Sequence, residues 1–400
     1  MKRRLSGIDA ARLSGEVVLV RTDLNVPLED GRVSEDQRIR ASVPTLRVLL
    51  EAGARPVVLS HLGRPKGSPD PEFSLRPVAE RLQELLGSPV RFVPEGSGPA
   101  VEKAVAAMEP GDVVLLENTR FLPGETTNDP DLARSWAALG SVFVNDAFGT
   151  AHRAHASTSG LADAVVTAGG IAVSGLLLER ELKYLREAID DPERPFVAIL
   201  GGAKISGKID VISALLPKVD RLLIGGAMAN TFFRAMGLET GRSLVEEDRL
   251  DVAREIIDGN GKRLVLPFDC VVAEEIEPGA ATRVVDREAV GKEDRIADIG
   301  PRTRALYADI IGNARTVVWN GPMGVFEIDA FADGTIEVAR ALADACDGGT
   351  LGIIGGGDSG AAAERAGVTD RISHISTGGG ASLDLLAGVA LPGVISLSDA

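Results

Sequence analysis

Short runs of residues that are apolar at nearly every position recur along the chain and alternate with longer amphipathic segments. In the first half the runs are Val17–Val20, Pro56–Leu59, Val90–Val93, Asp112–Leu116 and Val142–Val144. In the second half they are Phe196–Leu200, Arg221–Ile224, Arg263–Pro267, Thr316–Trp319, Leu351–Ile354 and Arg371–Ile375. Continuous apolar runs are typical of strands covered on both faces, and their alternation with helices is typical of a parallel sheet. The sequence therefore predicts an α/β fold of the doubly wound, Rossmann-like kind.

The segments between these runs have the helical spacing of apolar residues. They include Glu35–Ala52, Leu75–Leu86, Pro130–Leu139, Leu244–Asp258, Arg302–Gly312 and Thr335–Ala345. A further amphipathic segment, Gly175–Ile189, separates two halves of similar pattern. Because 400 residues exceed what one hydrophobic core usually supports, we expect two domains, residues 1–174 and 193–380, with an inter-domain helix at residues 175–192. Near the C-terminus the sequence indicates a short helix-like run, Ser382–Val389.

Composition and charge argue against several classes of protein. The formal net charge of −15 argues against nucleic acid or an anionic membrane as a partner. No apolar stretch approaches the roughly 18 residues that a membrane span needs, and the basic residues 1–13 lack the apolar core of a signal peptide. Cys270 and Cys346 each lie in an apolar run. We expect buried free thiols, which fit a cytoplasmic location.

Side chains that suit anions follow four of the first-half strands. These turns are Arg21–Asn25, Ser60–Arg64, Glu117–Arg120 and Asn145–His155. Ligands of open parallel sheets bind at the carboxyl ends of the strands, and arginine forks bind carboxylate and phosphate oxygens in pairs. Residues 1–173 hold 19 Lys and Arg against 22 Asp and Glu, whereas residues 174–400 hold 24 against 36. The pattern predicts an anion site in the first half.

Three of the four histidines, His61, His152 and His155, fall in these turns. A metal site is an alternative to the anion site, but no carboxylate or cysteine has a convincing ligand spacing with them. The pattern favours hydrogen bonding to a substrate, with a structural role as the alternative for His152 and His155.

Glycine-rich turns follow the strands of the second half. They are Gly201–Lys208, Gly225–Asn230, Asn320–Glu327, Gly355–Gly360 and Ser376–Gly380. Glycine lets backbone N–H groups approach phosphate oxygens, and a following helix N-terminus adds partial positive charge. Residues 202–208 have P-loop spacing, but Ile209 stands where a Ser or Thr is needed for Mg²⁺. Residues 355–360 fit the dinucleotide fingerprint but lack the acidic residue at the end of the next strand.

Ten motifs of the chain resemble those of the phosphoglycerate kinase family in residue type, order and spacing. They are RTDLNVPL, QRIRASVPTL, SHLGRP, LLENTRF, VNDAFGTAHRAHAS, LGGAKISGKI, IGGAMANTF, WNGPMGVFE, GGGDS and STGGGASL. The resemblance runs from Val17 to Ser382, and only Thr22 and Leu24 are noted departures, flanking Asp23 and Asn25. It implies two doubly wound domains with parallel six-stranded sheets, joined by the inter-domain helix and a hinge. It also implies that residues 381–400 return to the N-terminal domain.

The resemblance implies a glycolytic kinase, usually monomeric, that transfers a phosphoryl group in line in a closed interdomain cleft. The transfer runs reversibly from 1,3-bisphosphoglycerate to ADP, giving 3-phosphoglycerate and MgATP. The implied substrate-binding residues are Asp23, Leu24, Asn25, Arg38, His61, Leu62, Gly63, Arg64, Arg120 and Arg153. The implied nucleotide-binding residues are Gly201, Gly202, Lys204, Lys208, Gly225, Gly226, Asn320, Pro322, Glu327, Gly356, Gly357, Asp358 and Ser359. Among these, Asp358 is implied to bind Mg²⁺ and Glu327 the ribose.

A carboxylate or acyl phosphate needs no general base, so catalysis reduces to positioning and to neutralising charge on the transferring group. We expect Arg38 and Lys204, one from each half, to supply that charge, aided by the backbone N–H groups of Gly356 and Gly357. The expected hinge, at Thr377, Gly378, Gly379 and Gly380, closes the cleft and excludes water. Two alternatives are a non-catalytic binding protein of the same fold, which the presence of Arg38, Lys204 and Asp358 disfavours, and a nucleotide-linked dehydrogenase.

Overall fold

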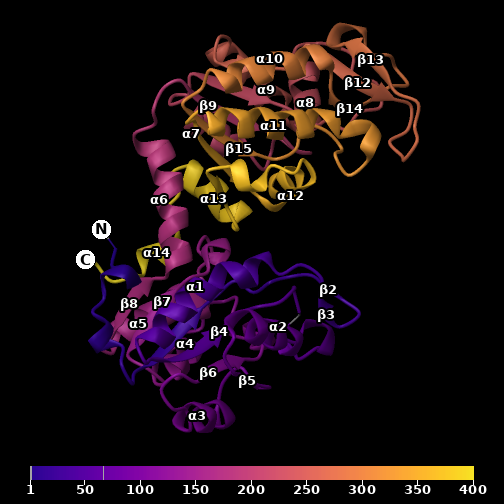
Figure 1. Cartoon of the computed structure of the whole chain (residues 1–400). Helices are drawn as coiled ribbons and strands as arrows, with labels where there is room; N and C mark the ends of the chain where they lie inside the picture. Colours follow the sequence, from indigo (N-terminus) through magenta and orange to yellow (C-terminus); the bar gives the residue numbers. More distant parts are fainter. Residues whose placement is uncertain (1, 66) are drawn as a thin grey trace. The chain divides into compact units, whose positions relative to one another are not determined.

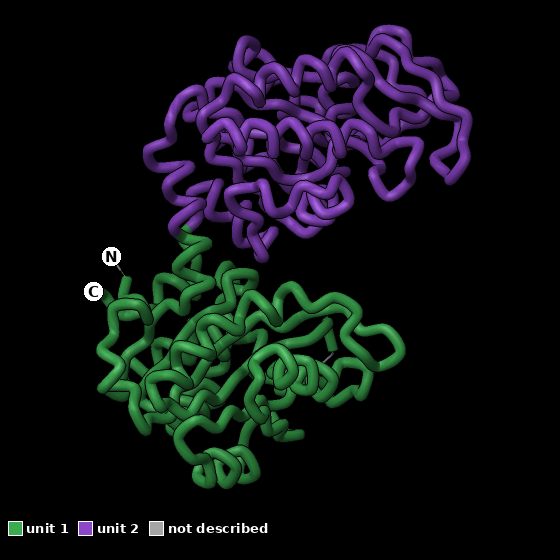
Figure 2. The backbone as a smooth tube through the Cα atoms, in the orientation of Figure 1, with its two compact units in different colours: residues 1–182, 390–400 green, residues 183–389 purple. Residues whose placement is uncertain are grey.

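The computed structural model describes residues 2–65 and 67–400, and the chain divides into two compact units (Figure 2). Unit 1 comprises residues 1–182 and 390–400, and unit 2 comprises residues 183–389. The division falls within helix α6 (Leu176–Asp190). These limits differ from the boundaries at residues 174, 192 and 380 that the sequence suggested. Helix α13 (Gly379–Leu386) belongs to unit 2, where it packs against α7 and β16, so the segment that belongs to unit 1 begins at Ala390.

Unit 1 is built on a six-stranded parallel sheet with the strand order β5-β6-β4-β1-β7-β8 (Figure 1). The strands are β1 (Val17–Arg21), β4 (Arg55–Leu59), β5 (Val90–Val93), β6 (Val113–Leu116), β7 (Val142–Asn145) and β8 (Ile171–Ser174). The helices are α1 (Gln37–Glu51), α2 (Arg76–Leu86), α3 (Pro99–Ala106), α4 (Pro130–Ala137), α5 (Leu161–Thr167) and α14 (Pro392–Ile395). A small hairpin, β2 (Leu28–Glu29) and β3 (Arg32–Val33), precedes α1.

The strand order of unit 1 explains why helices cover both faces of its sheet. From β1 the chain moves towards β5, and from β5 it moves back towards β8. Crossovers between parallel strands are right-handed, so a reversal of direction places the later helices on the opposite face. In agreement, α1 packs against α2 and α4 packs against α5. Strands β1, β6, β7 and β8 are buried at every position, as the continuous apolar runs predicted.

Unit 2 repeats this architecture with the strand order β11-β10-β9-β15-β16-β17 (Figure 1). Its strands are β9 (Phe196–Leu200), β10 (Arg221–Ile224), β11 (Leu264–Val265), β15 (Thr316–Asn320), β16 (Leu351–Gly355) and β17 (His374–Ile375). Its helices are α7 (Ile209–Leu215), α8 (Met228–Ala235), α9 (Leu250–Asn260), α10 (Pro301–Gly312), α11 (Asp333–Asp347), α12 (Gly357–Arg365) and α13. Two six-stranded parallel sheets confirm the fold class expected from the sequence.

An antiparallel sheet in unit 2 was not expected from the sequence. It consists of β12 (Asp269–Ala273), β13 (Arg283–Asp286) and β14 (Arg295–Ile299), with β12 in the centre. Strand β13 is mostly exposed, so it has no apolar run to mark it. The helix expected at Leu244–Asp258 was also wrong at its start, because residues 244–246 lie outside any helix and α9 begins at Leu250.

Local signals account for where several helices begin and end. The Asp129 carboxylate accepts hydrogen bonds from the amides of Asp131 and Leu132, which caps the start of α4. Helix α2 ends at Gly87, whose φ of 74° lies in the left-handed region that glycine adopts without strain. Among the described residues, no helix combines the length and the apolar character that a membrane crossing requires.

A buried tyrosine joins two strands of unit 2. The Tyr307 side chain is fully buried, and its hydroxyl lies 2.6 Å from the Ile224 carbonyl oxygen and 3.1 Å from that of Val265. The first contact holds the end of β10, and the second the end of β11. Burial raises the pKa of Tyr307, so the hydroxyl stays protonated and remains a donor.

We expect Tyr307→Phe to lower the free energy of unfolding of unit 2 by about 1–2 kcal/mol, because it leaves a buried carbonyl without its donor. Denaturation in urea measures the change. Tyr184→Phe is the matched control: Tyr184 is partly exposed and its ring stacks on His374, a contact that phenylalanine keeps. Equal stability of the wild type and the Tyr307 variant would contradict the structural role of this hydroxyl.

Candidate functional site

In unit 1 the ends of three neighbouring strands are in register, and the polar turns follow directly. Arg21, the last residue of β1, pairs with Leu59 of β4 on one side and with Asn145 of β7 on the other. The Thr119 amide donates to the Ser60 carbonyl, which brings the turn after β6 to the same edge. The four predicted turns therefore meet at the carboxyl edge of this sheet.

Asp23, Arg38 and His61 form the centre of this cluster. An Arg38 guanidinium nitrogen lies 3.1 Å from an Asp23 carboxylate oxygen. His61 Nδ1 lies 4.0 Å from the other oxygen of the same carboxylate. The side chains of Asp23 and His61 are buried, whereas that of Arg38 is 34% exposed. Asp23 therefore orients Arg38, which keeps part of its guanidinium in solvent, where a ligand can reach it.

Arg21 belongs to the same cluster: it begins one of the four predicted turns, although it was not among the substrate-binding residues that the family resemblance implied. Its side chain is fully buried, with one nitrogen 3.2 Å from His61 Nδ1 and Nε donating to Ser157 Oγ at 2.8 Å. The Ser157 hydroxyl in turn donates to the buried carboxylate of Glu125 at 2.6 Å. A polar residue at the last position of an apolar strand is the signal that marks Arg21 in the sequence. Its burial is visible only in the structure.

The cations of this edge are crowded together. Burial, followed by the charges of Arg21, Arg153 and Arg64, lowers the pKa of Arg120 to about 10 against the opposing charge of Glu125. Burial, followed by the charges of Arg21, Arg120 and Arg38, holds the pKa of His61 well below its usual 6.5. His61 is therefore neutral at physiological pH. Its neighbours repel one another, so an anion among them is electrostatically favoured.

The remaining predicted residues of unit 1 are of two kinds: some hold the turns in place through hydrogen bonds or backbone groups, and others are exposed cations. The Gly63 amide donates to Asn25 Oδ1 at 2.8 Å, and an Arg120 nitrogen donates to the Gly63 carbonyl. The side chains of Leu24 and Leu62 are buried, so these residues serve the site through their backbone. Arg64 and Arg153 are exposed. Gly63 has a φ of 61°, and a Cβ there would lie 2.2 Å from the Phe73 ring, so this turn requires glycine.

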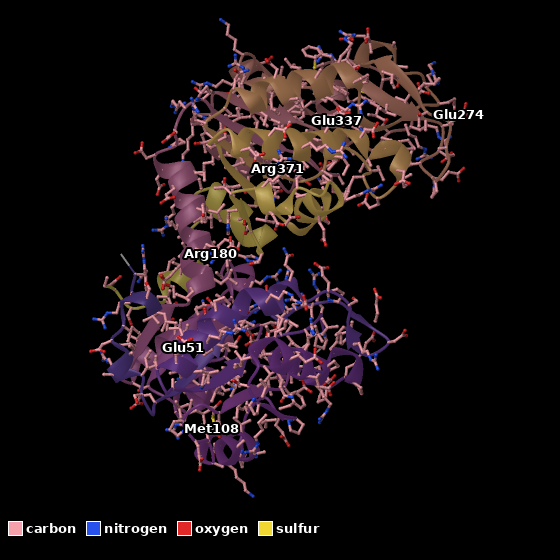
Figure 3. All side chains as sticks on the ribbon, viewed as in Figure 1. Glu51, Met108, Arg180, Glu274, Glu337 and Arg371 are labelled. Carbon is pink, nitrogen blue, oxygen red and sulfur yellow. The ribbon has the colours of Figure 1, made fainter. Side chains whose placement is uncertain are left out.

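Several arginines of unit 2 are paired with carboxylates, whereas three arginines at this edge of unit 1 are not. In unit 2, Arg371 binds Asp344 and Asp347, and Arg304 binds Asp333 and Glu337 (Arg371 and Glu337 are labelled in Figure 3). Within the described chain, the arginines at 64, 120 and 153 have no carboxylate within ion-pair distance. Three uncompensated guanidinium groups at one edge indicate an anion-binding site.

The two other histidines of these turns are not arranged around a metal. His155 Nδ1 lies 3.9 Å from the buried Glu125, and His152 Nε2 accepts from Arg153 Nε at 3.1 Å. In the part of the chain that the structure describes, no group of three His, Cys, Asp or Glu side chains could hold a metal ion. The geometry supports a structural role for both residues.

In unit 2 a pocket of about 260 Å³ lies at the carboxyl ends of β9, β15 and β16. Three glycine-rich turns and the first turn of α12 line it. The lining residues are Gly202, Ala203, Lys204, Gly207, Lys208, Asn320, Gly321, Pro322, Gly355, Gly356, Gly357, Asp358 and Ser359. Residues 356–358 form the N-terminus of α12, whose free N–H groups and partial positive charge suit a phosphate.

Lys208 and Asn320 fix the floor of this pocket. The Lys208 ammonium donates to Asn320 Oδ1 at 2.7 Å and to the Gly201 carbonyl at 2.6 Å. The Asn320 amide nitrogen donates to the Gly355 carbonyl at 2.8 Å, which joins the turns after β15 and β16. Burial lowers the pKa of Lys208 to about 8, while Asp358 opposes the shift. An anionic phosphate nearby would raise the pKa of this lysine again and so favour its charged form.

Four predicted nucleotide residues do not line this pocket. A Cβ at Gly201 would lie 2.1 Å from the Pro322 carbonyl oxygen, and one at Gly225 would lie 2.4 Å from Met323 Sδ. A Cβ at Gly226 would lie 2.4 Å from the Gly202 amide nitrogen. These glycines let the turns pack against one another, which is a structural requirement. Glu327 is exposed and lies outside the lining residues.

The pocket fits a divalent cation that is shared with phosphate oxygens. Among the described lining residues, Asp358 carries the one carboxylate, and it is exposed. One carboxylate is too few to hold Mg²⁺ alone, but Mg²⁺ is commonly bound by one or two carboxylates together with substrate phosphates and water. A negative side chain at a phosphate-binding helix N-terminus would otherwise repel the ligand. Asp358 therefore fits a metal that arrives with the nucleotide.

Together, a cationic edge in one doubly wound unit and a glycine-lined pocket in the other define the class of a phosphotransferase with an anionic substrate and a nucleotide. The family model for phosphoglycerate kinase matches residues 8–389. The chain therefore belongs to the phosphoglycerate kinase family, the glycolytic kinases that transfer a phosphoryl group between 1,3-bisphosphoglycerate and ADP.

Relatives and solved structures agree with this membership. A phosphoglycerate kinase of Chloroflexus aurantiacus is 54% identical over 405 aligned positions, covering 100% of this chain and 99% of the relative. One of Chlorobium limicola is 53% identical over 402 positions, covering all of both chains. The structure of phosphoglycerate kinase from Coxiella burnetii has a TM-score of 0.87 at 40% identity, covering 99% of this chain and 98% of its own. That from Pyrococcus horikoshii has a TM-score of 0.85 at 32% identity, with the same coverage.

Because His61 is buried and neutral, we expect the free energy of unfolding to depend on pH. Its pKa is lower in the folded than in the unfolded chain, so the unfolded state binds the proton more readily. Stability is therefore greatest above the unfolded pKa of about 6.5 and is lost as the pH falls below it. Between about pH 7.5 and about pH 5.5, the wild type should lose roughly 1.4 kcal/mol more than His61→Gln. Urea denaturation at both pH values tests this, and equal losses would contradict it.

Proposed function

We propose that the cationic edge of unit 1 binds the phosphorylated acid and that the pocket of unit 2 binds the nucleotide of the phosphoglycerate kinase reaction. The observation that carries the first assignment is the group of uncompensated arginines at residues 64, 120 and 153. A coupled assay for ATP formation from 1,3-bisphosphoglycerate and MgADP tests the activity itself. Absence of turnover by the folded protein would contradict the proposal.

In unit 1 the residues take different parts in binding. Arg64, Arg120 and Arg153 supply guanidinium forks for the oxygens of the phosphate and carboxylate groups. Neutral His61 and Asn25 supply hydrogen bonds that orient the substrate. Asp23 accepts from Arg38 and holds its guanidinium in place. Arg21 and Glu125 support this layer from below, because both are buried and joined through Ser157.

In unit 2 the glycine turns and the start of α12 bind the phosphates of the nucleotide. Gly356 and Gly357 line the pocket at the start of this helix, and Lys208 adds a positive charge at its floor. We propose that Glu327 binds the ribose, although it lies outside the pocket lining. Mg²⁺ held by Asp358 and phosphate oxygens would neutralise phosphate charge, which lowers the barrier to transfer.

The transfer itself requires little covalent chemistry from the protein. The attacking oxygen of a carboxylate or of a nucleoside diphosphate is already anionic, so no general base is needed. The barrier comes from bringing negative charges together. We propose that Arg38 and Lys204 neutralise the oxygens of the transferring group. Both side chains reach solvent, and within the described chain no ion pair engages Lys204.

Three further features of the proposal rest on membership in the family. We propose that the protein acts as a monomer in the cytoplasm. The hinge expected at residues 377–380 stays a prediction. In the structure Gly378 precedes α13 and its amide donates to Ser376 Oγ at 3.2 Å, while Gly379 and Gly380 open the helix.

We expect Arg38→Ala and Lys204→Ala each to lower kcat by about a hundredfold or more, because each removes charge that acts in the transition state. Nucleotide KM should change much less in both variants. Steady-state kinetics with both substrates varied measures this split. Arg40→Ala and Lys262→Ala are matched controls, since both side chains are exposed and lie away from the two sites. Near-wild-type kcat in either site variant would contradict its assigned role.

We expect Asp358→Asn to raise the Mg²⁺ concentration needed for half-maximal activity by about tenfold or more, because an amide is a weaker ligand for the hard cation than a carboxylate. Activity measured against free Mg²⁺ at fixed ADP gives the shift. Asp370→Asn changes an exposed carboxylate of the same unit and should leave the curve in place. An unchanged curve for the Asp358 variant would remove this residue from the metal site.

A further inference from the structure

A short segment of the connection between α8 and α9, called the strap, lies against α8 in unit 2. This strap, defined here as Leu244–Glu246, lies outside any helix. Two buried side chains of α8 hold it: the Asn230 amide nitrogen donates to the Leu244 carbonyl at 3.2 Å, and the Glu246 amide donates to Thr231 Oγ1 at 3.2 Å. The strap is therefore fixed to the helix that follows the Gly225–Gly226 turn.

The far end of the strap binds the loop that carries Lys204. One carboxylate oxygen of Glu246 accepts from Ser206 Oγ at 2.5 Å, and the other accepts from the Ser206 amide at 3.0 Å. Although partial burial acts to raise the pKa of Glu246, these two bonds, a bond from the Ile205 amide and the charge of Lys204 together lower it. The carboxylate therefore stays ionised and holds three donors of one loop.

This contact also explains why the P-loop spacing of residues 202–208 does not produce a P-loop. In a P-loop, backbone N–H groups of the turn point at the phosphates. Here the amides of Ile205 and Ser206 bind Glu246, so they are not available for that purpose. Phosphate binding in the pocket falls to the turns at 320–322 and 355–359 instead. The loop is left to present Lys204.

Hydrogen bonds of Gly202 and Lys208 hold the two ends of the loop, but its middle has few other anchors. Residues 203, 204, 206 and 207 are exposed, and glycine stands near both ends of the loop. The fully buried Ile205 fixes its position in the core, and its carbonyl accepts from the Lys208 amide at 2.8 Å. These contacts hold the ends of the loop and one inward-facing side chain, and none of them involves Ser206 or Lys204. The bidentate contact from Glu246 to Ser206 adds a constraint in the middle of the loop, and the Lys204 ammonium has no ion pair in the described structure.

We propose that Glu246 is a positioning residue for Lys204: by binding Ser206, it sets the direction in which the loop presents the lysine to the transferring phosphoryl group. This inference rests on the role of Lys204 under the proposed function. Glu246 acts through the loop and does not touch the pocket, because it is not among the lining residues. A short loop misdirected by about 1 Å can reduce the rate a hundredfold without weakening binding to the same degree.

The test compares Glu246→Ala, Glu246→Gln and Ser206→Ala by steady-state kinetics. We expect Glu246→Ala to lower kcat by about ten- to thirtyfold with less than about a threefold change in nucleotide KM, because the loss concerns the transition state. Glu246→Gln keeps one oxygen acceptor for Ser206 and should lose less. Ser206→Ala keeps the amide bond and should also lose less. Glu247→Gln alters the neighbouring exposed carboxylate, which does not reach the loop, and should match the wild type.

A double-variant cycle separates positioning from a merely structural role. If Glu246 acts through Lys204, then Glu246→Ala should have almost no further effect on kcat in a Lys204→Ala background. A structural role would instead lower kcat by the same factor in both backgrounds, and this result would overturn the inference. A kcat within twofold of the wild type in Glu246→Ala would also overturn it. If Glu246→Ala fails to fold, Glu246→Gln and Ser206→Ala carry the same cycle.

The outcomes also distinguish this inference from the proposed function on which it rests. If the wild type is inactive, or if Lys204→Ala retains its kcat, the proposed function fails at that point. If Lys204→Ala loses its activity while the Glu246 and Ser206 variants keep theirs, the proposed function stands and the positioning role is wrong.

Discussion

The register of parallel strands is the constraint on which both sites depend. In unit 1, Arg21 pairs with Leu59 and Asn145, so turns that are up to about 120 residues apart in the chain begin at one edge. In unit 2, Asn320 pairs with Leu200 and Gly355, which aligns three glycine turns in the same way. Because the strands run in the same direction, the turn that follows each strand must lie at the carboxyl edge of the sheet. The location of both sites therefore follows from the sheets.

Each unit has its site at the carboxyl edge of its own sheet, but the two sites differ in how they attract an anion. Unit 1 gathers cations that lack carboxylate partners, and it buries Arg21 with Glu125 and Asp23 as the nearest opposite charges. Burying an unpaired charge is costly, and burial together with the neighbouring cations lowers the pKa of both His61 and Arg120. Unit 2 uses backbone N–H groups instead of side-chain charge for most of its pocket. An anion with fixed negative groups suits the first site, and a nucleotide with its metal suits the second.

Much of the framework could be predicted from the sequence, because buried parallel strands leave a direct signal. The runs at β9, β10 and β5 matched the structure at both ends. Strand β8 was missed, as were α3 and α5, since small residues and short lengths weaken their periodicity. The antiparallel sheet was missed for a different reason. Strand β13 is exposed, so its residues carry no burial pattern.

In the site too, residues marked by the local sequence could be predicted, whereas contacts between distant parts of the chain could not. The turn residues were predictable because a polar residue directly after an apolar strand marks a strand end. The support beneath them was not, because its contacts join residues far apart in the chain: Arg21 and Ser157 are 136 positions apart, and Ser157 and Glu125 are 32 apart. Glu246 is a similar case. Its position suggested a helix, and only the contacts of its carboxylate with Ser206 show its connection to the site.

The central claim is that the acid and the nucleotide have separate sites, one at the cationic edge of unit 1 and one in the glycine-lined pocket of unit 2. Hydrogen exchange of the backbone amides, measured with each ligand alone, tests it most directly. The account predicts that 3-phosphoglycerate slows exchange at residues 23–25, 61–64 and 118–120 and that MgADP slows it at residues 202–208 and 355–359. Protection of the unit 2 turns by 3-phosphoglycerate, with no change in unit 1, would contradict the account.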